Sequence, residues 1–342
     1  MAIEGSGKAS AGATAIYDIT YALAARNGRH ETLFGPYAEQ AHEAFCHSVP
    51  AGTFPELWFE MPLLGEPWFD LHALTAREDL EPGQSFDPGE SGGYPEVFSW
   101  FAAQEPGIVR QLALSWDSSK NAERPAVQLL VGTSDPTVTC DFLAAAGRED
   151  AVAAYRAFRE RIPDTWFACY TGTFPNRPGM HLRVECTILR EQQDAYAQDA
   201  ALLEKHLRQV GLANLGDTLV ARCQELARTP FSLEFQFDVT ADGSAGPTMS
   251  ASVRFAPPVD PNDPEIFSVD GPAGELMQQV EAWGLADARW RQLADTVFAK
   301  RISRGQMEQR ICCYPAFIKL RWRDGEPVDA KTYLIAGMLW DA

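Results

Sequence analysis

Alternation of apolar and polar residues with a period of two recurs along this chain in five pairs of short runs, and it constrains the fold more than any other feature. Turn-forming residues separate the two runs of each pair, and Asp324-Gly325 is the strongest of these turn signals. Such runs predict antiparallel β-hairpins. The expected strands are residues 55–61 and 68–74, 111–116 and 126–131, 165–171 and 180–187, 231–239 and 249–255, and 316–323 and 330–335.

Segments with apolar residues at helical spacing separate the hairpins. The expected helical regions are residues 15–48, 94–104, 141–162, 191–207, 215–226 and 274–302. Ten strands in consecutive hairpins remove their exposed edges by closing on themselves. The sequence therefore predicts an α+β fold, a closed ten-stranded antiparallel β-barrel of five α-ββ repeats with the helices outside.

The alternation also predicts which way each strand faces. In the run 231–239, Leu233 and Phe235 alternate with Glu234 and Gln236. Because a helix layer must cover the apolar face, the polar face points into the lumen. The same argument predicts that three basic side chains point into the lumen: Arg183, Lys319 and Arg321.

Composition excludes several classes of function. The formal net charge is −18, whereas a surface that binds nucleic acid needs positive potential. No apolar run is long enough to cross a membrane, and the start of the chain lacks the apolar core of a signal peptide. We therefore expect a disordered segment at residues 1–14, a single domain at 15–342, and no nucleic-acid or membrane partner.

The seven cysteines form no CxxC pair and no zinc-binding spacing, which favours a reducing, cytoplasmic location and no metal site. The motifs that bind nucleotides or catalytic zinc are missing, namely GxGxxG, GxxxxGK[ST] and HExxH. The aspartate-rich DDxxD of magnesium-dependent terpene enzymes is missing too.

Five helix–hairpin units, about 340 residues and a polar-lined barrel resemble the ABBA aromatic prenyltransferase superfamily, the PT-barrel fold. Lys331-Thr332-Tyr333 matches the Lys-x-Tyr spacing with which that family holds prenyl diphosphate. The resemblance implies transfer of a prenyl group from an allylic diphosphate to an electron-rich aromatic acceptor. The acceptor would be a small metabolite or a peptide side chain, and no cofactor would be needed besides the diphosphate co-substrate.

The resemblance and the facing argument together give the candidate site residues. The expected diphosphate-binding residues are Arg183, Arg254, Lys319, Arg321, Lys331 and Tyr333. The expected acceptor-binding residues are Trp58, Tyr170 and Gln236. Glu60 lies roughly where family members with indole acceptors place a glutamate, and general-base work is its natural role. His181 and Glu234 complete the catalytic candidates.

The chain departs from the family pattern in two hairpins. Ala126, Gln128 and Leu130 stand where a Lys-x-Tyr pair is often found, and Asp70 and His72 stand where an arginine is common. Negative charge also enters the lumen, at Glu185, Glu234 and Asp238. Arg183 with Glu185, and Arg254 with Glu234, could form internal ion pairs that satisfy each other.

Two other functions therefore stay open. One is a barrel enzyme that performs acid–base chemistry without a prenyl donor, using Glu60, His181 and Glu234. The other is a non-catalytic barrel that binds an amphipathic ligand in its lumen. Four or more unpaired cations at one end of the lumen would favour the diphosphate, whereas charges that cancel in pairs would favour the alternatives.

Overall fold

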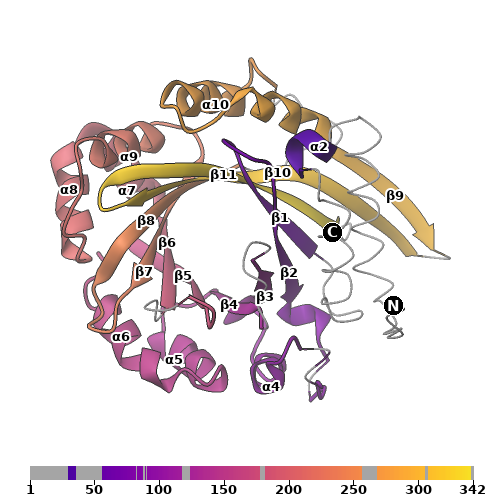
Figure 1. The fold of residues 1–342 in the computed structure, drawn as a ribbon. Coiled ribbons are helices and arrows are strands. Elements are labelled where there is room, and N and C mark those ends of the chain that lie inside the picture. The colour runs from indigo at the N-terminus through magenta and orange to yellow at the C-terminus, as the bar shows by residue number, and fades with distance from the viewer. Residues whose placement is uncertain are drawn as a thin grey trace, which may run out of the picture.

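The strands of the computed structural model form one antiparallel sheet that closes into a barrel (Figure 1). It describes residues 30–35, 56–81, 83–87, 89, 91–117, 124–177, 182–255, 268–304 and 307–339. The barrel strands are β1 Glu56–Pro62, β2 Asp70–Ala76, β3 Val109–Trp116, β4 Ala126–Val131, β5 Trp166–Thr173, β6 Leu182–Ile188, β7 Ser232–Val239, β8 Ala245–Arg254, β10 Met307–Arg323 and β11 Glu326–Leu339.

Each barrel strand pairs with its neighbours in chain order, and β11 pairs with both β10 and β1. The register that closes the barrel runs from Glu56 opposite Gly337 to Pro62 opposite Lys331. The closed ten-stranded antiparallel barrel of five helix–hairpin repeats is thus confirmed.

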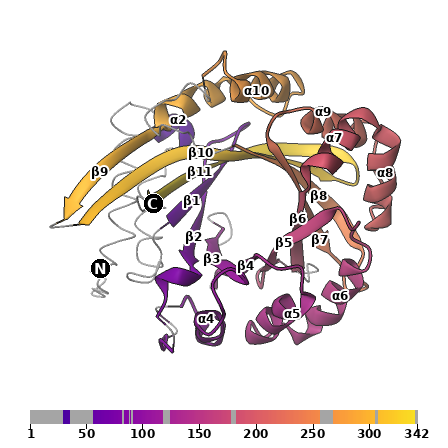
Figure 2. The ribbon, with the colours of Figure 1, turned by 180° about the vertical axis from the view of Figure 1, so that it is seen from behind.

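Helices surround the strands on the outside, as both views show (Figures 1 and 2). They are α2 His30–Leu33, α4 Pro95–Ala102, α5 Pro136–Ala145, α6 Glu149–Arg159, α7 Arg190–Gln198, α8 Ala200–Gln209, α9 Leu219–Ala227 and α10 Pro272–Ala282, with the 3-10 helices η1 Arg77–Asp79 and η3 Ala288–Thr296. The expected helices at residues 94–104 and 215–226 are found with shifted ends, the region 141–162 divides between α5 and α6, and the region 191–207 divides between α7 and α8 at Asp199. Most of the region 15–48 lies outside the described residues.

The predicted helical region 274–302 is wrong in its second half. Gly284, with φ of +73°, follows the end of α10, and η3 then begins after Asp287, whose side chain accepts a hydrogen bond from the Arg289 N–H. The chain next forms an eleventh strand, β9 Phe298–Arg304. The strand forms there because the first half of β10 extends beyond β8 and offers a free edge, with which β9 pairs in antiparallel register.

The apolar stripe on β7 packs outward, as its alternation predicted. Leu233, Phe235 and Phe237 are fully buried, and Phe237 stacks on Trp166 of β5 at 5.9 Å between ring centroids. Phe158 of α6 covers the same ring at 5.7 Å. The alternate residues of β7 therefore face the interior of the barrel.

Truncation of this stripe tests the packing between barrel and helices. Phe237→Ala should lower the free energy of unfolding by about 3–5 kcal/mol, because it removes a fully buried aromatic ring and leaves a cavity. Ser232→Ala, an exposed position at the start of the same strand, should change it by less than about 0.5 kcal/mol. Urea denaturation of both variants measures the difference, and equal losses would contradict the facing of β7.

Candidate active site

The barrel holds a cavity that is lined by side chains from every barrel strand. Eight of the predicted site residues line it: Trp58, Glu60, Tyr170, Arg183, Gln236, Arg254, Lys319 and Tyr333. The alternation with a period of two therefore predicted correctly that these side chains face the lumen.

Three other predicted site residues do not line the cavity, and a fourth lies outside the described residues. Lys331 and Glu234 do not line the cavity themselves, but each forms an ion pair with a residue that does, namely Glu60 and Arg254. Arg321 pairs with Asp329, its cross-strand partner on β11, and does not line the cavity. His181 lies outside the described residues.

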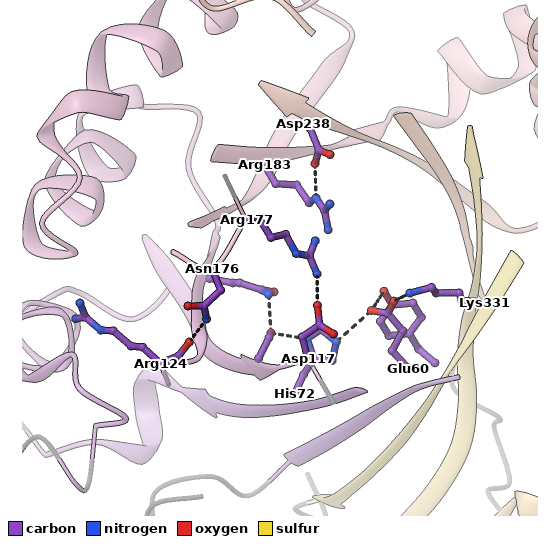
Figure 3. A network of polar contacts seen from close by, with 12 residues as sticks. Glu60, His72, Asp117, Arg124, Asn176, Arg177, Arg183, Asp238 and Lys331 are labelled. Carbon is purple, nitrogen blue, oxygen red and sulfur yellow. Dashed lines mark hydrogen bonds and ion pairs between the residues drawn. The ribbon is translucent and has the colours of Figure 1, made fainter. Parts of the chain in front are cut away.

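Glu60 is the centre of a cluster contributed by the strands where the barrel closes. Its Oε1 accepts a hydrogen bond from the Lys331 ammonium, and its Oε2 accepts one from the Tyr333 hydroxyl. The same Oε2 lies 3.2 Å from Nε2 of His72 on β2 (Figure 3). Tyr333 in turn accepts a hydrogen bond from the Lys319 ammonium at 2.8 Å.

These contacts set the charge of Glu60. Burial alone would raise its pKa, but the Lys331 charge, the His72 hydrogen bond and Lys319 outweigh burial and hold the pKa well below its usual value. Glu60 is therefore ionised at neutral pH. It is a strong hydrogen-bond acceptor and a poorer proton acceptor than an ordinary glutamate.

A hydrogen-bonded chain leads away from Glu60 across three further strands. Nδ1 of His72 lies 2.6 Å from Oγ of Ser115 on β3, and Nε2 of Gln128 on β4 lies 2.5 Å from the same oxygen. Burial lowers the pKa of His72, and the hydrogen bond and charge of Glu60 offset only part of this effect. His72 is therefore neutral at neutral pH.

Carboxylates pair with four of the five predicted diphosphate-binding cations. The pairs are Arg183 Nε with Asp238 Oδ1 at 2.7 Å, Arg254 Nε with Glu234 Oε1 at 3.1 Å, Arg321 Nε with Asp329 Oδ1 at 3.1 Å, and Lys331 with Glu60. The pair between Arg254 and Glu234 is the one that the sequence suggested. Arg183 pairs with Asp238 (Figure 3) rather than with Glu185, because Asp238 lies directly opposite it on β7.

Lys319 differs from these cations, because it forms no ion pair with a carboxylate in the described part of the chain. Burial lowers its pKa to about 8, although Glu60 and Glu185 partly offset this effect. The protonation state of its side chain therefore changes within about one pH unit of neutrality.

Glu185, on β6, is a second buried carboxylate of the lumen. It accepts a hydrogen bond from Nε2 of Gln236 at 2.7 Å, and no described cation forms an ion pair with it. Burial, followed by the nearby charge of Glu234, raises the pKa of Glu185 to about 7. Glu185 therefore exchanges a proton near neutral pH.

Aromatic rings form the wall beside Glu60. Phe317 stacks on Tyr333 at 4.0 Å between centroids, and Trp58 meets Phe317 edge-on at 5.4 Å. The guanidinium of Arg254 lies 5.3 Å from the Phe317 ring centroid. This wall offers both a surface for a planar substrate and π-faces that attract a cation.

Sequence reasoning did not include Ser115, His72 or Phe317 among the site residues. Period two places Ser115 on the same face as Gln111 and Ala113, which also line the cavity. That signal was available, but the pairing of His72 with Ser115 depends on the register between β2 and β3. Register is not visible in either strand alone.

The described residues contain no group of three or more His, Cys, Asp or Glu side chains that could hold a metal ion. Within the same residues, no helix combines the length and apolar character that crossing a membrane requires.

No protein-family model and no curated protein sequence matches the chain. Similar solved structures include the apo form of the prenyltransferase PriB, with 15% identity, a TM-score of 0.48 and coverage of 96% of each chain. They also include 6-dimethylallyl tryptophan synthase, with 13% identity, a TM-score of 0.48 and coverage of 96% of this chain and 97% of that one.

A further similar structure is NotF in complex with brevianamide F and DMSPP, with 8% identity, a TM-score of 0.47 and coverage of 98% of this chain and 96% of that one. At such identities the likeness concerns the fold. The assignment of the barrel therefore rests on the strand order of this chain.

The raised pKa of Glu185 predicts how stability depends on pH. Between the unfolded pKa near 4.3 and the folded pKa of about 7, the folded chain binds more protons, so this group makes stability fall as pH rises. Urea denaturation between about pH 5 and about pH 8 should show a shallower decline for Glu185→Gln than for the wild type. The exposed control Glu105→Gln should keep the wild-type slope, and parallel curves for all three proteins would contradict the assignment.

Proposed function

We propose that this barrel transfers a prenyl group from an allylic diphosphate to a small aromatic acceptor that carries an N–H or O–H group. One observation carries the proposal. An ionised carboxylate, Glu60, lies in an aromatic-walled cavity that two cationic residues, Lys319 and Arg254, also line.

The acceptor would be oriented by Glu60. A carboxylate offers about four lone-pair sites. Lys331, Tyr333 and His72 occupy three of them, which leaves roughly one for a donor group of the substrate. Trp58 would pack against the aromatic ring, while Tyr170 and Gln236 would contact the acceptor from β5 and β7.

The donor diphosphate would be bound by the basic residues together with Tyr333. Arg254 uses only Nε and Nη2 to hold Glu234. A guanidinium has five N–H donors, so Arg254 keeps donors for phosphate oxygens despite its ion pair. Arg183 and Lys319 line the same cavity, with Lys331 behind Glu60.

The charge balance of the cavity sets a condition on donor binding. Its lining holds four cations, Arg177, Arg183, Arg254 and Lys319, and four carboxylates, Glu60, Asp70, Asp117 and Glu185. A diphosphate adds nearly three negative charges, so its binding favours uptake of a proton. Glu185 is the group poised to take up that proton, because its pKa is about 7.

The pairing of the cations favours a second candidate function, acid–base chemistry without a prenyl donor. A lumen whose charges cancel in pairs attracts an anion less than an unpaired ring of cations would. Glu60 and Glu234 would then act with His181, or the cavity would only bind an amphipathic ligand. Calorimetric titration of the wild type with a non-hydrolysable dimethylallyl diphosphate analogue decides between these functions. Binding supports prenyl transfer, and absence of binding excludes it.

Replacement of Lys319 tests the donor site. Lys319→Met should weaken binding of the analogue roughly tenfold to a hundredfold, because a charge-assisted hydrogen bond contributes about 1.5–3 kcal/mol. Lys205→Met, an exposed position on α8, should bind the analogue as the wild type does. If Lys319→Met binds with unchanged affinity, the diphosphate does not reach Lys319.

Donor binding should also weaken as pH rises from about 6.5 to about 9, because Glu185 becomes ionised and Lys319 then loses its proton. Both changes make the cavity more negative, while Glu60, which also faces it, stays ionised throughout. Titrations at four pH values measure the slope, which should be reduced in Lys319→Met and in Glu185→Gln. A flat profile in the wild type would contradict this electrostatic account.

A further inference from the structure

A chain of four hydrogen-bonded side chains crosses the four strands β1 to β4 on the cavity side. Gln128 contacts Ser115, Ser115 contacts His72, and His72 contacts Glu60, at 2.5, 2.6 and 3.2 Å respectively. All four residues line the cavity.

The direction of each hydrogen bond follows from the ionised carboxylate at one end. Glu60 can only accept, so Nε2 of His72 carries the proton and donates. Nδ1 of the neutral imidazole is then an acceptor, and the Ser115 hydroxyl must donate to it. The amide Nε2 of Gln128 in turn donates to Oγ of Ser115. Each of the three contacts therefore pairs one donor with one acceptor.

Backbone geometry holds the chain in place. His72 and Ser115 are direct cross-strand partners between β2 and β3. An added Cβ at Gly172 would lie 3.0 Å from Cγ of Gln128, so the glycine on β5 leaves the room that Gln128 occupies. A hydroxyl that donates to an imidazole, which is itself oriented by a carboxylate, is the arrangement that activates hydroxyl groups in enzymes.

We propose that Ser115 and His72 are the proton-accepting pair of this site: the Ser115 hydroxyl takes a proton from the bound aromatic substrate while it passes its own proton to Nδ1 of His72. This inference rests on the proposed function for its substrate. It assigns to Glu60 the task of holding the substrate and the imidazolium rather than that of the base.

The protons and electrons balance for prenylation at a ring carbon. The new C–C bond forms as the C–O bond to diphosphate breaks, and diphosphate leaves with that electron pair. The ring carbon then loses its proton to Oγ of Ser115, and the C–H electron pair restores aromaticity. The original hydroxyl proton moves to Nδ1 of His72, and the imidazolium so formed is paired with Glu60 until it releases a proton to solvent.

The charges around His72 are consistent with His72 as the base and Glu60 as the group that holds the substrate. Glu60, Lys319, Lys331 and Tyr333 face His72 from β1, β10 and β11. Burial keeps the pKa of His72 below its usual value, so that the imidazole is free to accept a proton. Glu60, with its pKa well below the usual value, is the weaker base of the two.

The first test needs no substrate. Nitrogen-15 NMR of histidine-labelled protein, with the His72 signals assigned by their loss in His72→Gln, should show the tautomer that is protonated at Nε2. Ser115→Ala should raise the pKa of His72, because its neutral form loses the donor to Nδ1, whereas the exposed control Ser99→Ala should not. A tautomer protonated at Nδ1 overturns the proposed pair, and so does a His72 pKa that is unchanged in Ser115→Ala.

The second test measures turnover of dimethylallyl diphosphate with tryptophan. Ser115→Ala and His72→Gln should each lower kcat about a hundredfold or more with little change in KM for tryptophan. Ser115→Thr keeps a hydroxyl and should restore most of the rate. The acidic limb of the kcat profile should follow the pKa of His72 measured by NMR. An unchanged kcat in Ser115→Ala overturns the inference.

The two tests separate the two proposals. Turnover by the wild type together with an Nδ1-protonated tautomer leaves prenyl transfer standing and removes the pair. No turnover together with the expected tautomer and titration removes prenyl transfer with this donor and acceptor. The hydrogen-bonded pair is then judged by the NMR test alone, which needs no substrate.

Discussion

The pairing of β1 with β11 is the contact on which the rest of the structure depends. It joins the first and last barrel strands over seven residue pairs. Without it the sheet would keep two open edges, and its polar face would be exposed to water. Closure turns that face into a lumen of low dielectric constant. It also brings Glu60 to Tyr333, 273 residues later in the chain, so the centre of the candidate site exists only once the barrel has closed.

Enclosure explains why so many charges in the lumen are paired. A buried charge without a partner costs several kcal/mol, by order of magnitude, and cross-strand carboxylates remove that cost for Arg183, Arg254 and Lys331. Lys319 and Glu185 are left without an ion pair among the described residues, and burial shifts the pKa of each toward neutrality. The same physics that neutralises most of the lumen therefore leaves two groups able to exchange protons.

Errors in reading the sequence arose where local pattern and long-range pairing disagree. Residues 298–304 follow a helical stripe, yet they form β9, because the extended β10 offers a free strand edge. Arg183 and Glu185 lie on one face of one strand, yet Arg183 pairs with Asp238 across to β7. In both places the partner lies on another strand, and the local spacing of residues does not indicate which strand that is.

The sequence by itself determined the ten barrel strands, their turns, and most of the side chains that face inward, because alternation with a period of two is a local property of each strand. Trp58, Glu60, Tyr170 and Lys319 could therefore be placed in the lumen before the structure was known. Only the tertiary structure decided the register, and with it the ion pairs, the contact between His72 and Ser115, and the shifted pKa values. These depend on which residues of different strands meet and how deeply they are buried, and both follow from closure of the whole chain.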